Sequence, residues 1–248
     1  KLKAEFLQHW YDSNGIPLRS RMIAYITHIN RLGSITPQVT NFVLSNNITS
    51  KILMKSLGFE PKRTLPLLSK TTLKRWHKRN KASQQFPNGV VYLLPDEFTN
   101  YNDSHIGIKA IELLNSLGYE VILVDIFESG RTYISKGLIR TAKRIANRNI
   151  EKLKDFISDE TPLIGIEPSA ILSFRDEYLD LALSHNKQTA NKLAKNALLF
   201  EEFFMREVEK GKIKKVQFKE QNISIKLHGH CQQKAVASTI PTKAMLSF

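Results

Sequence analysis

The only cysteine of the chain, Cys231, lies beside two histidines, His228 and His230, in the sequence HGHC. Two imidazoles and a thiol are ligand types that suit zinc or iron. A closed metal site takes about four ligands, and no other residue of this chain supplies a thiolate. The sequence therefore leaves two interpretations open. Either HGHC is part of a metal site, or its histidines cap the following helix and the cysteine packs as a small buried residue.

Three further polar turns carry side chains able to bind a ligand. The first begins PDEF, the second reads ESGR and the third reads EPSA. Gly130 allows a tight bend in the second turn, and Arg131 offers a forked guanidinium to a carboxylate or phosphate. In the third turn, Ser169 is predicted to cap a helix. The candidate binding residues of these turns are Asp96, Glu128, Ser129, Gly130, Arg131 and Glu167.

Each of the four turns follows a segment that is typical of a β-strand. Apolar runs occupy 90–94, 119–126 and 162–166, and the apolar residues of 223–227 alternate with polar ones. Between them, apolar residues at helical spacing predict helices over 106–117, 135–157 and 187–209. This alternation predicts an α/β fold, with a mainly parallel, Rossmann-like sheet covered by helices on both faces. The four turns would then meet at one edge of the sheet, where such proteins bind ligands.

The first third of the chain is strongly basic. Residues 1–86 hold 15 Lys and Arg against three acidic residues, a balance of +12 out of +14 for the whole chain. Short apolar stripes that end at glycines predict an all-helical segment with a linker, followed by the α/β domain over 87–248. This charge would attract an acidic protein surface or a phosphate backbone, or it belongs to solvated helix faces. No recognition motif for bases is present, which argues against nucleic acid.

Bulk features set further expectations. No apolar run approaches the roughly 18 residues of a membrane helix, and a single cysteine excludes an internal disulfide and favours a reducing, cytoplasmic location. The sequence starts at Lys1 without Met and stops at Phe248 within a helical pattern, so we interpret it as a piece of a longer protein. P-loop, GxGxxG and Ser-His-Asp patterns are missing from the sequence.

The turns, taken together, resemble a known family. The succession PDEFTNYND, ESGRTYISKGL, IGIEPSAILSFRDEY and LHGHCQQKA is similar to the cysteine-rich CCG-type domain of iron–sulfur oxidoreductases. It most resembles the C-terminal region of FAD-linked D-2-hydroxyacid dehydrogenases, which follows a flavin domain and a ferredoxin-like domain. The resemblance covers 88–248, and KLKAEFLQHWYDSNGIPLRSR also looks like the segment after the ferredoxin-like domain.

The chain departs from the family at the positions of the cluster ligands. The family has a cysteine pair where this chain has Glu128 and Ser129, and a further cysteine where it has Ala170. The family's HGHCHQKA appears as HGHCQQKA, with Gln232 in place of a histidine. The first half of the motif therefore lacks thiolates. Cys231 would ligate a metal only together with residues beyond Phe248.

The resemblance implies the C-terminal electron-transfer or docking portion of a FAD-linked iron–sulfur enzyme that oxidises a 2-hydroxy acid. FAD would be held on a separate domain, the iron–sulfur cluster would be complete only in the full-length protein, and this fragment alone would be inactive. The basic helices would dock on the flavin and ferredoxin-like domains of the same polypeptide. The alternative is a non-redox α/β module that binds an anionic metabolite or nucleic acid.

Overall fold

A four-stranded parallel sheet lies at the centre of the molecule, a computed structural model that describes residues 2–82 and 84–248. The strand order is β2-β1-β3-β4, and each neighbouring pair is parallel. This order confirms the predicted α/β fold. It also gives the sheet a switch point, because the chain leaves β1 toward β2 on one side and later returns to β3 on the other. The strands are β1 (Gly89–Leu93), β2 (Tyr119–Leu123), β3 (Leu163–Gly165) and β4 (Ala197–Leu199).

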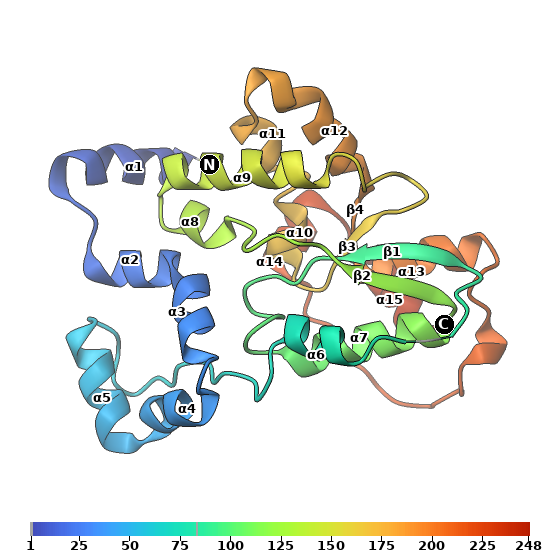
Figure 1. Ribbon diagram of the computed structural model, residues 1–248, viewed down its shortest axis with the longest axis horizontal. Coiled ribbons are helices and arrows are strands. Elements are labelled where there is room, and N and C mark those ends of the chain that lie inside the picture. The colour runs from blue at the N-terminus through green and yellow to red at the C-terminus, as the bar shows by residue number, and fades with distance from the viewer. Residues whose placement is uncertain (1, 83) are drawn as a thin grey trace.

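Helices cover both faces of the sheet, as the sequence predicted. Leu163 and Ile164 are adjacent in β3, point to opposite faces and belong to two different hydrophobic cores. Ala146 and Ile150 of α9 pack in the core of Leu163, whereas Leu114 of α7 packs in the core of Ile164. Figure 1 shows α9 and α7 on opposite sides of the sheet. The helices from the sheet region onward are α7 (Ser104–Ser116), α8 (Arg131–Ser135), α9 (Ile139–Leu153), α10 (Pro168–Leu172), α11 (Glu177–Leu181), α12 (Lys187–Asn196), α13 (Phe200–Glu209), α14 (Cys231–Val236) and α15 (Ile240–Leu246).

The basic segment before the sheet is helical, as expected. Pro37 lies in the first turn of α4, where its missing N–H costs nothing. Asn46 caps α5 by accepting hydrogen bonds from the amides of Ile48 and Thr49. The helices of this segment are α1 (Leu2–Asn14), α2 (Leu18–Ala24), α3 (Ile26–Gly33), α4 (Pro37–Ser45), α5 (Asn47–Ser56) and α6 (Leu73–Arg79).

The free edge of the sheet at β2 is covered by α6. Lys74 Nζ donates to the carbonyl oxygen of Ile126 at 2.6 Å, and His77 Nε2 contacts the carbonyl oxygen of Val121 at 2.9 Å. Leu73 of the same helix is fully buried in the core on the α7 side. Polar side chains that occupy edge carbonyls prevent another strand from adding there. The basic segment thus completes the sheet.

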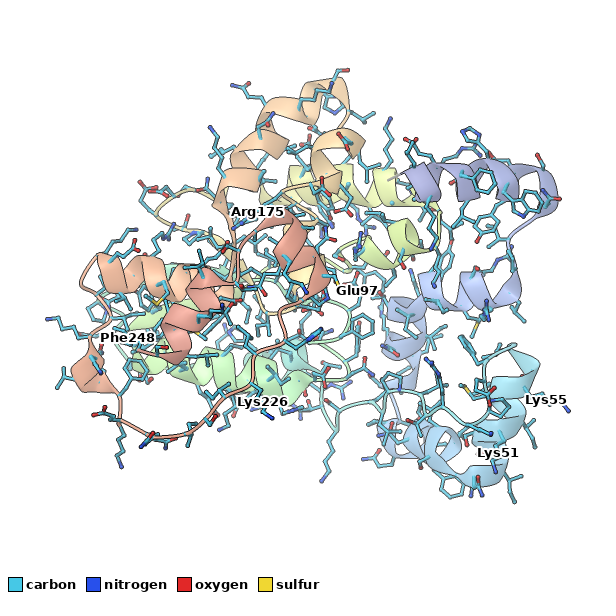
Figure 2. The ribbon with its side chains drawn as sticks, turned by 180° about the vertical axis from the view of Figure 1, so that it is seen from behind. Lys51, Lys55, Glu97, Arg175, Lys226 and Phe248 are labelled. Carbon is cyan, nitrogen blue, oxygen red and sulfur yellow. The ribbon has the colours of Figure 1, made fainter. Side chains whose placement is uncertain are left out.

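Two predictions for the C-terminal third were wrong. The alternating residues Ile223, Ile225 and Leu227 form no strand, and their side chains are 63%, 49% and 41% exposed. This extended segment crosses the outside of the molecule, where Lys226 marks it in Figure 2. The fourth strand is β4 instead, within 187–209, which was predicted to be one long helix. β4 takes the position beside β3, where Ala197 is fully buried.

No helix among the described residues is long and apolar enough to cross a membrane. This agrees with the absence of a membrane-spanning pattern in the sequence.

Candidate functional site

Three of the predicted polar turns lie at the same edge of the sheet. Asp96 follows β1, Glu128 follows β2 and Glu167 follows β3, and these three strands are parallel neighbours in the order β2-β1-β3. Parallel strands present their carboxyl ends together. The turns after β1 and β3 flank the switch point, which is the usual ligand crevice of an open α/β sheet.

Two adjacent carboxyl groups in the turn after β1 are almost completely buried. Asp96 is 1% exposed and Glu97 is 2% exposed. Burial raises the pKa of Asp96 to about 7, and the neighbouring Glu97 carboxylate raises it further against the opposing hydrogen bonds to Thr99 and Phe98. Asp96 Oδ2 has no hydrogen-bond partner among the described residues. A neutral, protonated Asp96 therefore suits this environment near pH 7.

Glu97 binds the turn that follows β2. Its Oε1 accepts hydrogen bonds from the amide of Ser129 at 2.7 Å and from the hydroxyl of Ser129 at 2.8 Å. The amide of Arg131 in turn donates to Ser129 Oγ at 3.1 Å. Burial raises the pKa of Glu97, while its hydrogen bonds oppose the rise. Ser129 is fully buried, so its hydroxyl is used inside the fold and is not offered to a ligand.

Glu128 is held between the sheet edge and the N-terminal helices. Tyr133 donates to Glu128 Oε2 at 3.2 Å, and His28 Nε2 of α3 lies 3.8 Å from Glu128 Oε1. Asn149 of α9 donates to the Glu128 carbonyl oxygen at 2.8 Å. Burial raises the pKa of Glu128, while the Tyr133 hydrogen bond and the charge of Arg148 oppose the rise.

The second turn bends at Gly130 as predicted, since its φ is +82°, in the left-handed region. Arg131 begins α8, and its guanidinium forms an ion pair with Glu177 of α11. That carboxylate takes the place that the sequence analysis reserved for a ligand. Arg131 thereby joins α8 to α11 within the fold.

The turn after β3 contacts the HGHC segment. Glu167 caps α10 by accepting from the amide of Ala170 at 2.6 Å, and Ser169 Oγ donates to the same carboxylate at 2.7 Å. The helix cap is therefore Glu167, and the prediction that Ser169 would be the cap was wrong. His230 Nε2 lies 3.9 Å from Glu167 Oε1, which places α14 beside α10.

The HGHC residues behave in two different ways. His230 Nδ1 accepts from the amide of Gln232 at 3.1 Å, so this histidine caps α14, as one of the two interpretations held. Cys231 is an exposed free thiol and does not pack as a buried residue. His228 is also exposed, at the end of the extended segment that replaced the predicted strand. Within the described residues, no group of three His, Cys, Asp or Glu side chains is arranged to hold a metal ion.

The predicted site residues thus fall into two groups. Asp96, Glu128 and Ser129 meet around Glu97 at the turns after β1 and β2. Glu167 lies with His230 at the turn after β3. The sequence analysis missed Glu97 as the centre of the first group, although it directly follows Asp96 and ends the same apolar run.

An iron–sulfur cluster does not fit the turn after β2. Cluster ligation needs thiolates, whereas this turn offers Glu128 and Ser129, and a carboxylate from Glu97 already binds the Ser129 amide and hydroxyl. Tyr178 adds to this packing by donating to the Ser129 carbonyl oxygen at 2.7 Å. The turn is filled by hydrogen-bonded side chains of the protein itself.

Three comparisons relate the chain to known proteins. It is 25% identical over 210 residues to D-2-hydroxyglutarate dehydrogenase of Escherichia coli (strain K12), covering 80% of this chain and 20% of that protein. It is 26% identical over 187 residues to D-2-hydroxyglutarate dehydrogenase of Pantoea ananatis, covering 71% of this chain and 18% of that protein. It is 25% identical over 241 residues to a subunit of anaerobic glycerol-3-phosphate dehydrogenase of Escherichia coli (strain K12), and this match covers 95% of this chain and 59% of that protein.

No family model matches the chain, and no solved structure matches it. The chain spans about a fifth of the D-2-hydroxyglutarate dehydrogenases and 59% of the matched part of glycerol-3-phosphate dehydrogenase. Over most of its length, the chain is therefore related to a region of these dehydrogenases.

Proposed function

We propose that this chain is the C-terminal electron-transfer or docking portion of a multidomain FAD-linked iron–sulfur oxidoreductase of the 2-hydroxy-acid dehydrogenase type. Residues 87–248 would form its CCG-like α/β domain, and residues 1–86 would form a basic helical extension. Hydride chemistry would take place at FAD on a separate domain, so the chain alone would be inactive. The observation that carries the proposal is the relationship to D-2-hydroxyglutarate dehydrogenase across 80% of the chain.

The arrangement of the polar turns supports this assignment. The three turns that carry the family-like motifs lie at the carboxyl edge of adjacent parallel strands. His230 brings the HGHC motif to the third of them, at 3.9 Å from Glu167. An edge of this kind is where an α/β domain holds a cofactor or meets the domain that does.

A docking role for the basic extension is supported by its exposed surface. Val39, Phe42, Ile48 and Ile52 of α4 and α5 are 62–70% exposed. The sequence contains no acidic residue between Asp12 and Glu60. Figure 2 shows Lys51 and Lys55 on α5, far from the sheet. Apolar side chains among uncompensated positive charges fit a more acidic flavin or ferredoxin-like domain of the same polypeptide.

Only the HGHC segment keeps a thiol for redox chemistry. Cys231 is exposed and free, and His228 is exposed nearby. In the proposal, Cys231 would ligate iron only with residues from elsewhere in the full-length protein. The turn after β2 would have a structural role.

Iron analysis of anaerobically purified full-length protein tests the proposal. Wild type is compared with Cys231→Ala, and Ser224→Ala on the exposed segment serves as the matched control. We expect a visible chromophore in wild type and a lower iron content in Cys231→Ala but not in Ser224→Ala. Unchanged iron in Cys231→Ala would remove this thiol from the redox site, and colourless wild-type protein would remove the redox function.

The second candidate is a non-redox α/β module that binds an anionic metabolite or nucleic acid. It is favoured by the side chains that fill the turn after β2 in place of thiolates. Binding of nucleic acid by the basic extension would weaken steeply with salt. Absence of binding to single- or double-stranded oligonucleotides at low salt would exclude the nucleic-acid version.

A further inference from the structure

A row of cationic side chains runs along α9. Arg140, Arg144, Arg148 and Lys152 occur at every fourth residue, so they lie on one side of the helix. The two end members are paired, Arg140 with Asp12 at 2.6 Å and Lys152 with Asp125 at 3.2 Å. Among the described residues, neither Arg144 nor Arg148 forms an ion pair or a side-chain hydrogen bond, and both are exposed.

Helix α3 brings two more basic groups to the middle of this row. The ring of His28 lies 4.8 Å from the ring of Phe127, and the guanidinium of Arg31 lies 5.5 Å from the same ring. Phe127 belongs to the turn after β2, and its half-buried ring is a shelf between α3 and α9. His28 Nε2 also lies 3.8 Å from Glu128.

Electrostatic interactions place the three arginines around this shelf. The pKa of His28 is lowered by burial and then by the charges of Arg31 and Arg148. The charges of Arg148 and Arg144 both act on Glu128 and oppose the rise in its pKa that burial causes. One imidazole and one carboxyl group therefore sense all three guanidiniums, although these come from helices more than one hundred residues apart in sequence.

The positive charge at this place exceeds the negative charge that the fold supplies. Three guanidiniums face one buried carboxyl group, Glu128, whose ionisation burial disfavours. Asp125, the nearest exposed carboxylate in the same turn, is paired with Lys152. Guanidinium groups bind phosphate oxygens through paired N–H donors. The place is also the carboxyl edge of a parallel strand, where α/β proteins bind ligands.

We propose that Arg31, Arg144 and Arg148, with His28, form a binding site for a small, multiply charged anion of the phosphate class above the Phe127 ring. The site uses none of the HGHC residues. It therefore stands whether or not the full-length protein carries a redox centre. The opposing interpretation is that the arginines serve only as countercharges to Glu128.

Titration of the full-length protein with inorganic pyrophosphate at constant ionic strength tests the site. Calorimetry gives the affinity, and NMR of the histidine ring protons locates the ligand. We expect saturable binding, an upward shift of the pKa of His28 as negative charge arrives, and about tenfold weaker binding in Arg148→Ala and in Arg144→Ala. Lys109→Ala is the matched control, because it removes one positive charge from the exposed side of α7.

Each other outcome overturns the proposal. Equal affinity in Arg148→Ala and Lys109→Ala would mean that pyrophosphate responds only to net charge. Absence of binding to wild type, together with loss of stability in Arg148→Ala that Glu128→Gln restores, would make the arginines countercharges to Glu128. Much tighter binding of an oligonucleotide than of pyrophosphate, lost in the same arginine variants, would replace the small anion by nucleic acid.

Discussion

Glu97 accepts hydrogen bonds from both the amide and the hydroxyl of Ser129, at 2.7 and 2.8 Å, in a fully buried environment. This pair joins the turn after β1 to the turn after β2. Ser129 occupies a position where the resembling family has a thiolate. The carboxylate of Glu97 thus takes up donors in a turn that, in the family, would face a cluster.

Ser129→Ala removes one of these donors and leaves part of a buried carboxylate unpartnered. We expect the free energy of unfolding to fall by about 1–3 kcal/mol. Urea denaturation followed by circular dichroism measures it. Ser116→Ala, which removes an exposed hydroxyl bonded to the Leu113 carbonyl oxygen, should change stability much less. Equal effects of the two substitutions would mean that the buried pair adds nothing specific.

The buried carboxyl of Asp96 makes stability depend on pH. Its pKa is raised from 3.8 to about 7, so the folded state holds a proton that the unfolded state releases above pH 3.8. The free energy of unfolding should therefore be largest at acidic pH and should decrease as pH rises toward about 7. Each pKa unit corresponds to about 1.4 kcal/mol, so the loss is of the order of a few kcal/mol.

Asp96→Asn isolates this effect, because its side-chain oxygen can still accept from the amides of Phe98 and Thr99. The variant should be more stable than wild type at pH 8 and should lose less stability between pH 4 and pH 8. Asp125→Asn, at a side chain 95% exposed, is the control and should leave the pH profile unchanged. An unaltered profile in Asp96→Asn would show that this carboxyl is ionised in the folded state at neutral pH.

Arg175 fixes the outermost strand to the helices around it. Its Nε donates to the Ala197 carbonyl oxygen of β4 at 2.6 Å, and its two terminal nitrogens bind the Glu202 carboxylate. Lysine cannot form this fork, so Arg175→Lys should lower the free energy of unfolding by about 1–3 kcal/mol.

The matched control for Arg175→Lys is Arg140→Lys. Arg140 also forks onto a carboxylate, that of Asp12, but is 72% exposed against 18% for Arg175. The exposed pair should contribute under about 1 kcal/mol. Thermal denaturation of both variants makes the comparison, and a larger loss in Arg140→Lys would contradict the anchoring of β4 by Arg175.

The extended segment before α14 should be the first site of proteolysis. Lys219 and Lys226 are exposed and lie outside any helix or strand, as protease-sensitive sites do. Brief trypsin treatment under native conditions should cut after these residues before cutting within α9, as mass spectrometry of the fragments will show. Lys219→Gln combined with Lys226→Gln should slow the first cleavage. An unchanged rate would place the sensitive site elsewhere.

The sequence predicted the sheet well where strands are long and apolar, at 90–94 and 119–126. It failed for β4, because Leu193, Ala197, Phe200 and Phe204 keep helical spacing across a three-residue strand. It failed again at 223–227, where alternation favours a strand but the position next to β3 is already occupied by β4. A local pattern states what a segment can form, and competition for a place in the sheet decides what it does form.

The candidate site was predicted in part. Asp96, Glu128 and Glu167 were expected from their places after apolar runs, and the structure puts them at the carboxyl ends of adjacent strands. The bond between Glu97 and Ser129 joins residues 32 positions apart, which no spacing rule connects. The approach of His28 to Glu128 depends on how α3 packs, and nothing in either local sequence reports that.

The cover that α6 provides for β2 bears on how the protein can be divided for experiment. A polypeptide that started at residue 87 would lack the Lys74 and His77 side chains that occupy the outer carbonyls of β2, and the Leu73 side chain inside the molecule. Its bare strand would be open to pairing with other molecules. Such a truncation should therefore be prone to form aggregates, whereas one that retains 73–79 keeps its margin protected.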